Sequence, residues 1–367
     1  MNRKKSFVIL VSLLCCLTEI SAQETNEKNV SDRPSVYVPI NIKKYEQEPQ
    51  KFPIHLCSIY PWGIHGQQSK NHIYNISLSL IVGKVRGMNG LQISGLYSQA
   101  PDGFNGIQIA GLGGNSAGRL KGVQIGGVTN YTVRMRGIQI SGLANAGADN
   151  AAGIQISGIV NAAGSINGVQ IGGIGSAAQN MNGIQIGGVS TIAQNMNGLQ
   201  ISGTYNRIDT LKGVSISIAS FADTIAKGFS LSLVNIVKQG YYKEWELSFS
   251  DYANVAISYR MGTPKFYTVY TTGARFIEDK YWITGVGFGN RTPVGKRFAL
   301  QPELVYSLIF PTDFKNIQNV NETRFKLGLV YRVNEKISVA LAPSVYLMYE
   351  NKQRTTGFGG SLGIGIQ

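Results

Sequence analysis

One short alternation of aliphatic and polar residues recurs ten times between Gly90 and about Gly240. Each copy reads glycine, aliphatic, glutamine, isoleucine, small residue, glycine, aliphatic, as in residues 183–189, and the last two copies lose the glutamine and the second glycine. The copies open at residues 90, 106, 122, 137, 153, 168, 183, 198, 213 and 228. Because a fixed step of 15 or 16 residues is the signature of a repeat architecture, the pattern predicts stacked units with atypical terminal copies.

The alternation within each copy predicts a β-strand. Aliphatic residues at the second and fourth positions would face a core, and the glutamine between them would face outward. The outward glutamines would stack as an amide ladder, formed by Gln92, Gln108, Gln124, Gln139, Gln155, Gln170, Gln185 and Gln200. If the glutamines face outward, Gln155→Ala should have little effect on stability, whereas Ile156→Asp should unfold several coils.

A turn is expected inside each copy, at its second glycine. The aliphatic residues at the fourth and seventh positions have opposite parity, as Ile109 and Leu112 illustrate. Both can face one core only if the chain turns between them, and glycine is the residue that turns there most easily. A further apolar residue lies two positions before most opening glycines, for example Leu120 before Gly122.

Two all-β architectures could use this repeat. In an antiparallel sheet, alternate loops lie at opposite ends, so the sequence period would be two copies. Here adjacent copies match each other, since residues 192–198 closely follow the pattern of residues 178–183. The sequence therefore favours a glycine-rich parallel β-solenoid of 15–16-residue repeats, with one large continuous antiparallel outer-membrane barrel as the alternative.

The composition changes after residue 240. Residues 241–367 hold 22 of the 35 aromatic residues, and glycine no longer recurs at a fixed step. Residues 323–333 and 358–366 alternate apolar with polar or small side chains, and about eight such segments are joined by short turns. This pattern predicts a small antiparallel β-barrel with apolar residues outside, typical of the outer membrane; a soluble barrel or sandwich is the alternative.

The N-terminal residues indicate export. Arg3, Lys4 and Lys5 precede the apolar run 7–17, and Ile20 to Ala22 offers a small-residue cleavage site. The chain is thus expected to comprise a signal peptide at 1–22, a flexible leader at 23–50, an N-terminal cap region at 51–89, the repeat solenoid at 90–240 and the antiparallel barrel at 241–367.

Candidate chemistry is sparse. The histidines of the chain, His55, His65 and His72, lie near Cys57, but their spacing matches no familiar metal-ligand pattern. Asp149 is the one charged residue between 137 and 206, and Asp102, Asp209 and Asp223 fall in other copies. We therefore expect no catalytic, cofactor-binding or metal site and no cofactor; a carbohydrate-active β-helix enzyme remains the third functional alternative.

The net charge of +14 also limits the partners. Lysine and arginine are dispersed rather than gathered into a stripe with stacking aromatics, so nucleic acid is not expected as a partner. Attraction to anionic lipopolysaccharide and outer-membrane lipid accounts for the charge more simply. A surface polysaccharide or another protein is the further candidate partner.

The tandem phrases, the entry Trp62-Gly-Ile-His-Gly66 and the aromatic segment Phe266 to Tyr270 together resemble a family of secreted surface-repeat proteins from Gram-negative bacteria. The resemblance covers roughly residues 57–350 and implies an outer-membrane or cell-surface location with no assigned activity. It carries over no catalytic or binding residue. The leading expectation is a non-enzymatic, adhesin-like structural or interaction module. The alternative is a porin-like channel in which repeats and C-terminal strands close one barrel.

Overall fold

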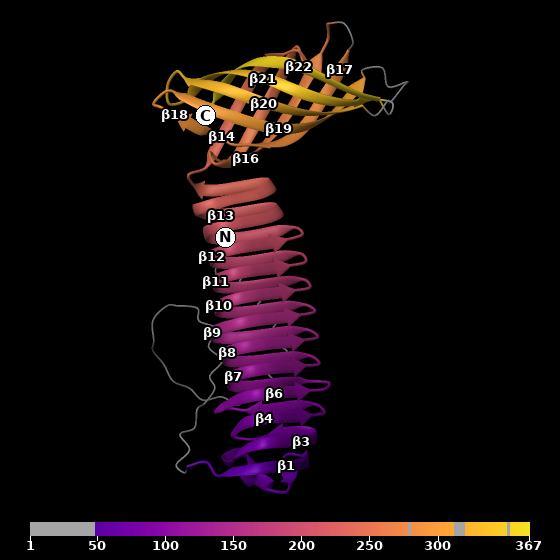
Figure 1. Cartoon of the computed structure of the whole chain (residues 1–367), viewed down its shortest axis with the longest axis vertical. Helices are drawn as coiled ribbons and strands as arrows, with labels where there is room; N and C mark the ends of the chain where they lie inside the picture. Colours follow the sequence, from indigo (N-terminus) through magenta and orange to yellow (C-terminus); the bar gives the residue numbers. More distant parts are fainter. Residues whose placement is uncertain (1–47, 278–279, 312–319, 351–352) are drawn as a thin grey trace, which may run out of the picture. The chain divides into compact units, whose positions relative to one another are not determined.

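The computed structural model describes residues 48–277, 280–311, 320–350 and 353–367, and all of its long elements are β-strands (Figure 1). The predicted signal peptide at 1–22 and residues 23–47 of the predicted leader lie outside the described residues. Two sheets form, and the first ends in β13 while the second begins with β14. The alternative of one continuous barrel is therefore wrong, because repeats and C-terminal strands belong to separate sheets.

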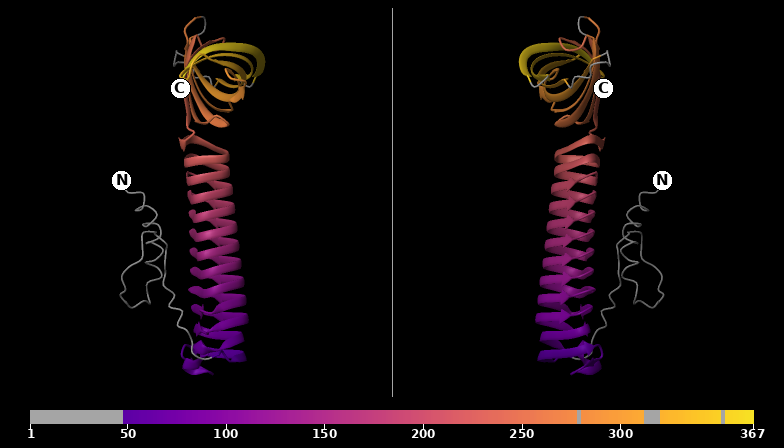
Figure 2. Two further views of the ribbon diagram at one scale, coloured as in Figure 1. Left: turned by 90° about the vertical axis from the view of Figure 1, so that its left-hand side faces the viewer. Right: turned by 90° about the vertical axis from the view of Figure 1, so that its right-hand side faces the viewer.

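The first sheet is the parallel solenoid that the repeat predicts. Its strands are β1 (Lys51–Ile59), β2 (Trp62–Gly63), β3 (Ile73–Lys84), β4 (Gly87–Ser94), β5 (Tyr97–Ala100), β6 (Gly103–Ala110), β7 (Gly114–Gly126), β8 (Thr129–Ser141), β9 (Ala144–Ser157), β10 (Val160–Gly172), β11 (Gly175–Gly187), β12 (Ser190–Ser202) and β13 (Tyr205–Gln239), with a 3₁₀ helix η1 (Gly66–Asn71) after β2. Each copy of the phrase lies beside the next in register, so that Gln124 of β7 pairs with Gln139 of β8. Figure 2 shows these coils stacked in sequence order.

The stacked coils of the solenoid begin before the first copy of the repeat at residue 90. Strand β1 pairs in parallel with β3, and His55 lies opposite Ser77 in that register. Within the predicted N-terminal cap region at 51–89, residues 75–80 of β3 are thus preceded by a further coil.

The prediction that the aliphatic side chains of the solenoid strands face the interior and the glutamines face outward is wrong. The phrase glutamines are buried, with Gln124 and Gln139 at 0% exposure, whereas Ile125 and Ile140 are 38% and 39% exposed. The buried positions also include the apolar residue two places before the opening glycine, such as Leu120. The glutamines can occupy the interior without penalty because each amide bonds its neighbour.

Two amide ladders occupy the solenoid interior and run in opposite directions. In the glutamine ladder each Nε2 donates to the Oε1 of the preceding coil, as from Gln124 to Gln108 and from Gln139 to Gln124, both at 2.7 Å. In the asparagine ladder each Nδ2 donates to the Oδ1 of the following coil, as from Asn130 to Asn145 at 2.9 Å. Asn130 also donates to the backbone carbonyl of Ile140 at 2.7 Å, which ties the two walls of a coil together.

Glycine permits this close stacking at two places in each copy. The opening glycine Gly137 has a φ of +151°, and a Cβ there would meet the carbonyl oxygen of Gly122 at 1.9 Å. At the second glycine, Gly158, a Cβ would lie 2.1 Å from the carbonyl oxygen of Gly142. The chain does turn at that second glycine, as predicted, but there the requirement for glycine is space.

The second sheet closes into an antiparallel barrel of eight strands, which confirms the predicted fold class. The strands are β14 (Tyr242–Ser250), β15 (Val255–Thr263), β16 (Phe266–Arg275), β17 (Tyr281–Gly289), β19 (Phe298–Pro311), β20 (Val320–Arg332), β21 (Ile337–Glu350) and β22 (Gln353–Ile366), with a short β18 (Thr292–Val294) paired to β19. Pairing of β17 with β19 and of β14 with β22 completes the closure, so none of the eight long strands leaves a free edge.

Candidate functional site

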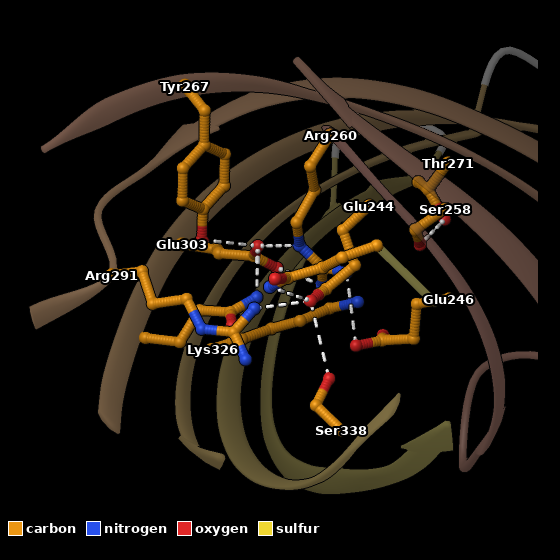
Figure 3. Close-up of polar contacts among 12 residues, drawn as sticks. Glu244, Glu246, Ser258, Arg260, Tyr267, Thr271, Arg291, Glu303, Lys326 and Ser338 are labelled. Atoms are coloured by element: carbon orange, nitrogen blue, oxygen red, sulfur yellow. Dashed lines mark hydrogen bonds and ion pairs between the residues drawn. The ribbon is translucent and has the colours of Figure 1, made fainter. Parts of the chain in front are cut away.

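The barrel interior is lined by charged side chains, because alternate residues of each strand point inward. Glu244 and Glu246 of β14 are buried, whereas Trp245 between them is 56% exposed. Figure 3 shows these two carboxylates converging with side chains from other strands of the barrel. The inward alternation therefore builds a polar cluster inside a small barrel.

Arg260 of β15 is the centre of this cluster. Its guanidinium holds Glu303 through two nitrogens, with Nε to Oε1 at 2.6 Å and Nη2 to Oε2 at 3.2 Å. Its Nη1 lies 3.3 Å from Glu244 Oε1 and 3.1 Å from Glu246 Oε2. One buried arginine thus joins carboxylates from β14 and β19, and the fork geometry of arginine suits this arrangement.

Other side chains donate further hydrogen bonds to the same carboxylates. Glu303 Oε1 also accepts the Tyr267 hydroxyl at 2.8 Å and Gln301 Nε2 at 2.9 Å. Glu244 Oε2 accepts from Arg291 Nη1 and from the side-chain amide of Gln367 at 3.0 Å. Each of these carboxylates therefore has partners for its charge inside the barrel.

A second buried cluster is centred on Arg324 of β20. Its guanidinium binds Glu322 through Nε at 2.6 Å and Nη2 at 3.0 Å, and its Nη1 lies 3.0 Å from Asp251 Oδ2. The same guanidinium lies over the ring of Tyr252, at 4.3 Å from its centroid, and Lys326 Nζ donates to the Tyr252 hydroxyl at 2.6 Å. These contacts fix two more cations inside the wall of the barrel.

This arrangement fills the barrel interior with paired charges. Four carboxylates, those of Glu244, Glu246, Glu303 and Glu322, face four cations, those of Arg260, Arg291, Arg324 and Lys326, and all eight side chains are buried. Carboxylates engaged by guanidinium groups are poor general bases, and removal of one partner from a buried ion pair costs about 3–5 kcal/mol. The barrel interior is thus lined by buried, oppositely charged side chains held in ion pairs.

The outward face of the barrel is apolar. In β20, Phe325, Leu327 and Leu329 are 44–47% exposed, while Arg324 and Lys326 between them are buried, as the alternation predicts. The other outward apolar residues include Trp245, Leu247, Phe249, Ile257, Trp282, Leu300, Leu304, Tyr306, Leu308, Phe310, Leu341, Val345, Leu347, Phe358, Leu362, Ile364 and Ile366. Such a closed apolar surface with aromatic residues is the pattern of a barrel that faces lipid.

The histidines of the N-terminal region do come together. His65 Nδ1 lies 3.5 Å from His55 Nδ1, and the rings of His65 and His72 have centroids 6.0 Å apart. Phe52 and Tyr74 pack among them, at 4.5 Å from His65 and 4.8 Å from His55 between centroids. Within the described residues, no group of three or more histidine, cysteine, aspartate or glutamate side chains could hold a metal ion.

Burial governs the protonation of this histidine cluster. It lowers the pKa of His55 to about 4, with a smaller contribution from the charge of His65. The pKa of His72 is lowered for the same two reasons, and burial raises the pKa of the nearby Cys57 thiol. Burial therefore favours the neutral forms of His55 and His72 within the packing of the first coils.

Asp102, Asp209 and Asp223 of the repeat region are engaged in ion pairs, whereas Asp149 is exposed. Asp102 binds Arg86 at 2.5 Å, and Arg207 Nη2 bridges Asp209 at 3.2 Å and Asp223 at 2.9 Å. Sequence reasoning treated Asp209 and Asp223 as unrelated, yet β13 brings both to one arginine. Charge neutralisation by Arg207 leaves this pair without the unpaired acid and base that glycoside hydrolysis uses.

The interior of the barrel was the part of the site that sequence reasoning missed. It placed Arg324 and Lys326 opposite Phe325 but did not single out Glu244, Arg260 or Glu303. The signal was present in β14, where two glutamates alternate with tryptophan and leucine. Strand alternation assigns them to the interior, but only closure shows that they meet an arginine from another strand.

The solved structures that this chain resembles include one outer-membrane protein. No protein-family model matches the chain, and no curated protein matches it. The backbone structure of the Yersinia pestis outer membrane protein Ail in a phospholipid bilayer nanodisc is 12% identical, with a TM-score of 0.24, and the match covers 35% of this chain and 99% of that one. Among the described residues, no helix has the length and apolar character needed to cross a membrane.

Proposed function

We propose that this protein is a non-enzymatic outer-membrane protein, anchored by its C-terminal barrel, whose solenoid serves as an interaction module. The proposal rests on one observation: the strands of the barrel point apolar side chains outward and charged side chains inward. Phe325, Leu327 and Leu329 face outward from β20, while Arg324 and Lys326 face a charged interior. An apolar exterior is stable in the hydrocarbon region of a bilayer, and closure satisfies every backbone group of the strands there.

The filled interior supports anchoring rather than transport. Arg260, Glu244 and Glu303 form a connected ion-pair cluster that links β14, β15 and β19 across the interior. Eight-stranded barrels enclose a space that side chains can fill. The protein is accordingly a membrane-held scaffold, and the lipid and lipopolysaccharide of the outer membrane are its immediate partners.

Reconstitution of the full chain tests this function. We expect the protein to insert into phospholipid vesicles, to resist extraction by alkaline carbonate and to give no discrete channels in planar bilayers. Fractionation of the producing cells should place it in the outer membrane. Reproducible conductance steps would sink the anchoring proposal and favour transport, and complete extraction by carbonate would sink the membrane location itself.

A further inference from the structure

The solenoid carries an aliphatic outer face that its own fold leaves uncovered. Two rows of outward side chains are aligned coil by coil in the parallel register of β1, β3, β4 and β6–β10. One row comprises Ile54, Ile76, Leu91, Ile107, Val123, Ile138, Ile154 and Val169, and the other comprises Leu56, Leu78, Ile93, Ile109, Ile125, Ile140, Ile156 and Ile171. We call these sixteen residues the aliphatic face.

None of the sixteen side chains is buried in the fold. Leu56 is 47% exposed, Ile107 45%, and Ile125 and Ile140 just under 40%. Exposed apolar patches on monomeric proteins rarely exceed a few hundred Å², and larger ones mark interaction sites. The aliphatic face offers on the order of 800 Å², which matches the area that each partner contributes to a standard stable interface.

We propose that the aliphatic face packs against the same face of a second copy of this chain. Two β-sheets pack face to face about 10 Å apart when their side chains interdigitate, and the rungs here recur at the strand spacing of about 4.8 Å. A partner must share that spacing to fit all eight coils at once, and a second copy does so by construction. A self-complementary face related by a two-fold axis closes as a dimer.

Charge permits this pairing in spite of the basic composition. The chain carries a net charge of +14, which opposes close approach of two copies in general. All sixteen residues of the aliphatic face are uncharged, and the basic Lys121 and Arg136 point to the same outward side but lie two residues before its first row, at the edge of the face. The rows also contain no tryptophan or tyrosine of the kind that anchors proteins at a lipid interface.

The test measures the association of the full chain in detergent micelles by sedimentation velocity over a dilution series. The test variant carries Ile125→Thr, Ile140→Thr and Ile156→Thr, which keep strand propensity and remove apolar surface. The matched control carries Arg119→Thr, Arg134→Thr and Asn150→Thr, aligned in the same three coils on another row. We expect a dimer for the wild type and the control, and a dissociation constant of the dimer that is at least about 100-fold higher in the test variant.

A second measurement identifies what covers the face. A probe attached at Ile159→Cys, close to the aliphatic face along the chain, in a background with Cys15→Ser, Cys16→Ser and Cys57→Ser, should report a defined distance to its equivalent in a second copy. It should not be quenched by brominated lipid in vesicles. A wild-type monomer, an unweakened test variant or quenching by lipid would each overturn the proposal. Insertion of the barrel is scored separately in every variant, so failure of the membrane anchor is distinguishable from failure of the dimer.

Discussion

At the scale of single residues, the chemistry of this protein depends on amides placed where hydrocarbon was expected. Gln155 donates to Gln139 at 2.8 Å and accepts from Gln170 at 2.9 Å, so it is bonded on both sides within the solenoid. A buried amide costs free energy only when it lacks partners, and a stack of identical amides supplies them at every step. The solenoid interior is thus polar in composition but satisfied in bonding.

The first prediction follows from this ladder. Gln155→Ala removes an acceptor from Gln170 and a donor from Gln139, and it opens a cavity. We expect it to lower the free energy of unfolding of the solenoid by about 2–5 kcal/mol. Hydrogen exchange of the peptides from β9 and β10 measures the effect. Ile156→Ala, at a residue 37% exposed, is the control and should cost about 1 kcal/mol. Equal loss in both variants would contradict the observed facing.

The second residue-scale prediction concerns the opening glycines. Gly137→Ala forces a Cβ against the carbonyl oxygen of Gly122 at a positive φ, so we expect a loss of at least about 2 kcal/mol. Gly147→Ala is the matched control, because the nearest atom to its Cβ would be Gln155 Nε2 at 3.5 Å. Urea unfolding followed by Trp62 fluorescence compares the two. A harmless Gly137→Ala would mean that the coils are stacked less closely than the structure indicates.

At the scale of elements, β1, η1 and β3 form a histidine-containing start to the solenoid whose stability depends on pH. His55 is buried and neutral in the folded chain, with its pKa lowered to about 4, against 6.5 in the unfolded chain. Between these values the unfolded state binds more protons than the folded state. The free energy of unfolding therefore decreases as the pH falls from about 7 towards 4, and the loss is complete below pH 4.

This third prediction can be measured locally. With Trp245→Phe and Trp282→Phe, Trp62 becomes the one tryptophan and reports the first coils. Its unfolding midpoint in urea should fall as the pH is lowered from 7 to 4, by the equivalent of about 1–3 kcal/mol. His55→Gln removes the titrating group and should flatten most of this dependence. A dependence unchanged in His55→Gln would assign it to other groups, with His72 the next candidate.

At the scale of the whole molecule, the solenoid and the barrel both bury polar side chains and expose apolar ones. The solenoid buries polar amides and exposes isoleucine, and the barrel buries ion pairs and exposes leucine and phenylalanine. In both, the outward aliphatic surface calls for an environment other than water. Our proposals assign lipid to the barrel surface and a second copy to the solenoid surface.

The fourth prediction tests the lipid assignment. Leu327→Arg puts a charge on the outward face of β20 and should cost about 2–4 kcal/mol at the centre of a bilayer. We expect a smaller fraction of folded, heat-resistant barrel after refolding into vesicles. Leu112→Arg, at a solenoid residue 76% exposed, is the matched control and should leave the barrel folding unchanged. An equal yield for Leu327→Arg and wild type would contradict a lipid-facing β20.

Much of this architecture was predictable from local patterns. The step of 15 or 16 residues predicted the coils, their parallel stacking and the turn at the second glycine. Strict alternation in residues 323–333 predicted which barrel side chains face in and out. A sign of the true facing was also present, since Lys121 shares its parity with Ile125, while Leu120 shares it with Gln124. Hydrophobicity alone assigns Ile125 to the core, whereas its shared parity with Lys121 assigns it to the outer side, where the structure places it.

By itself, the sequence determined the period and the strands, because these depend on spacings along the chain, and it favoured a solenoid separate from the barrel. The tertiary structure alone decided which side of each solenoid strand is inside. The free energy of burying Gln124 depends on whether Gln108 and Gln139 lie within hydrogen-bond distance, and this condition exists only after stacking. Closure of the barrel likewise decided that Arg260 meets Glu303, because an ion pair between distant strands is a property of three-dimensional packing.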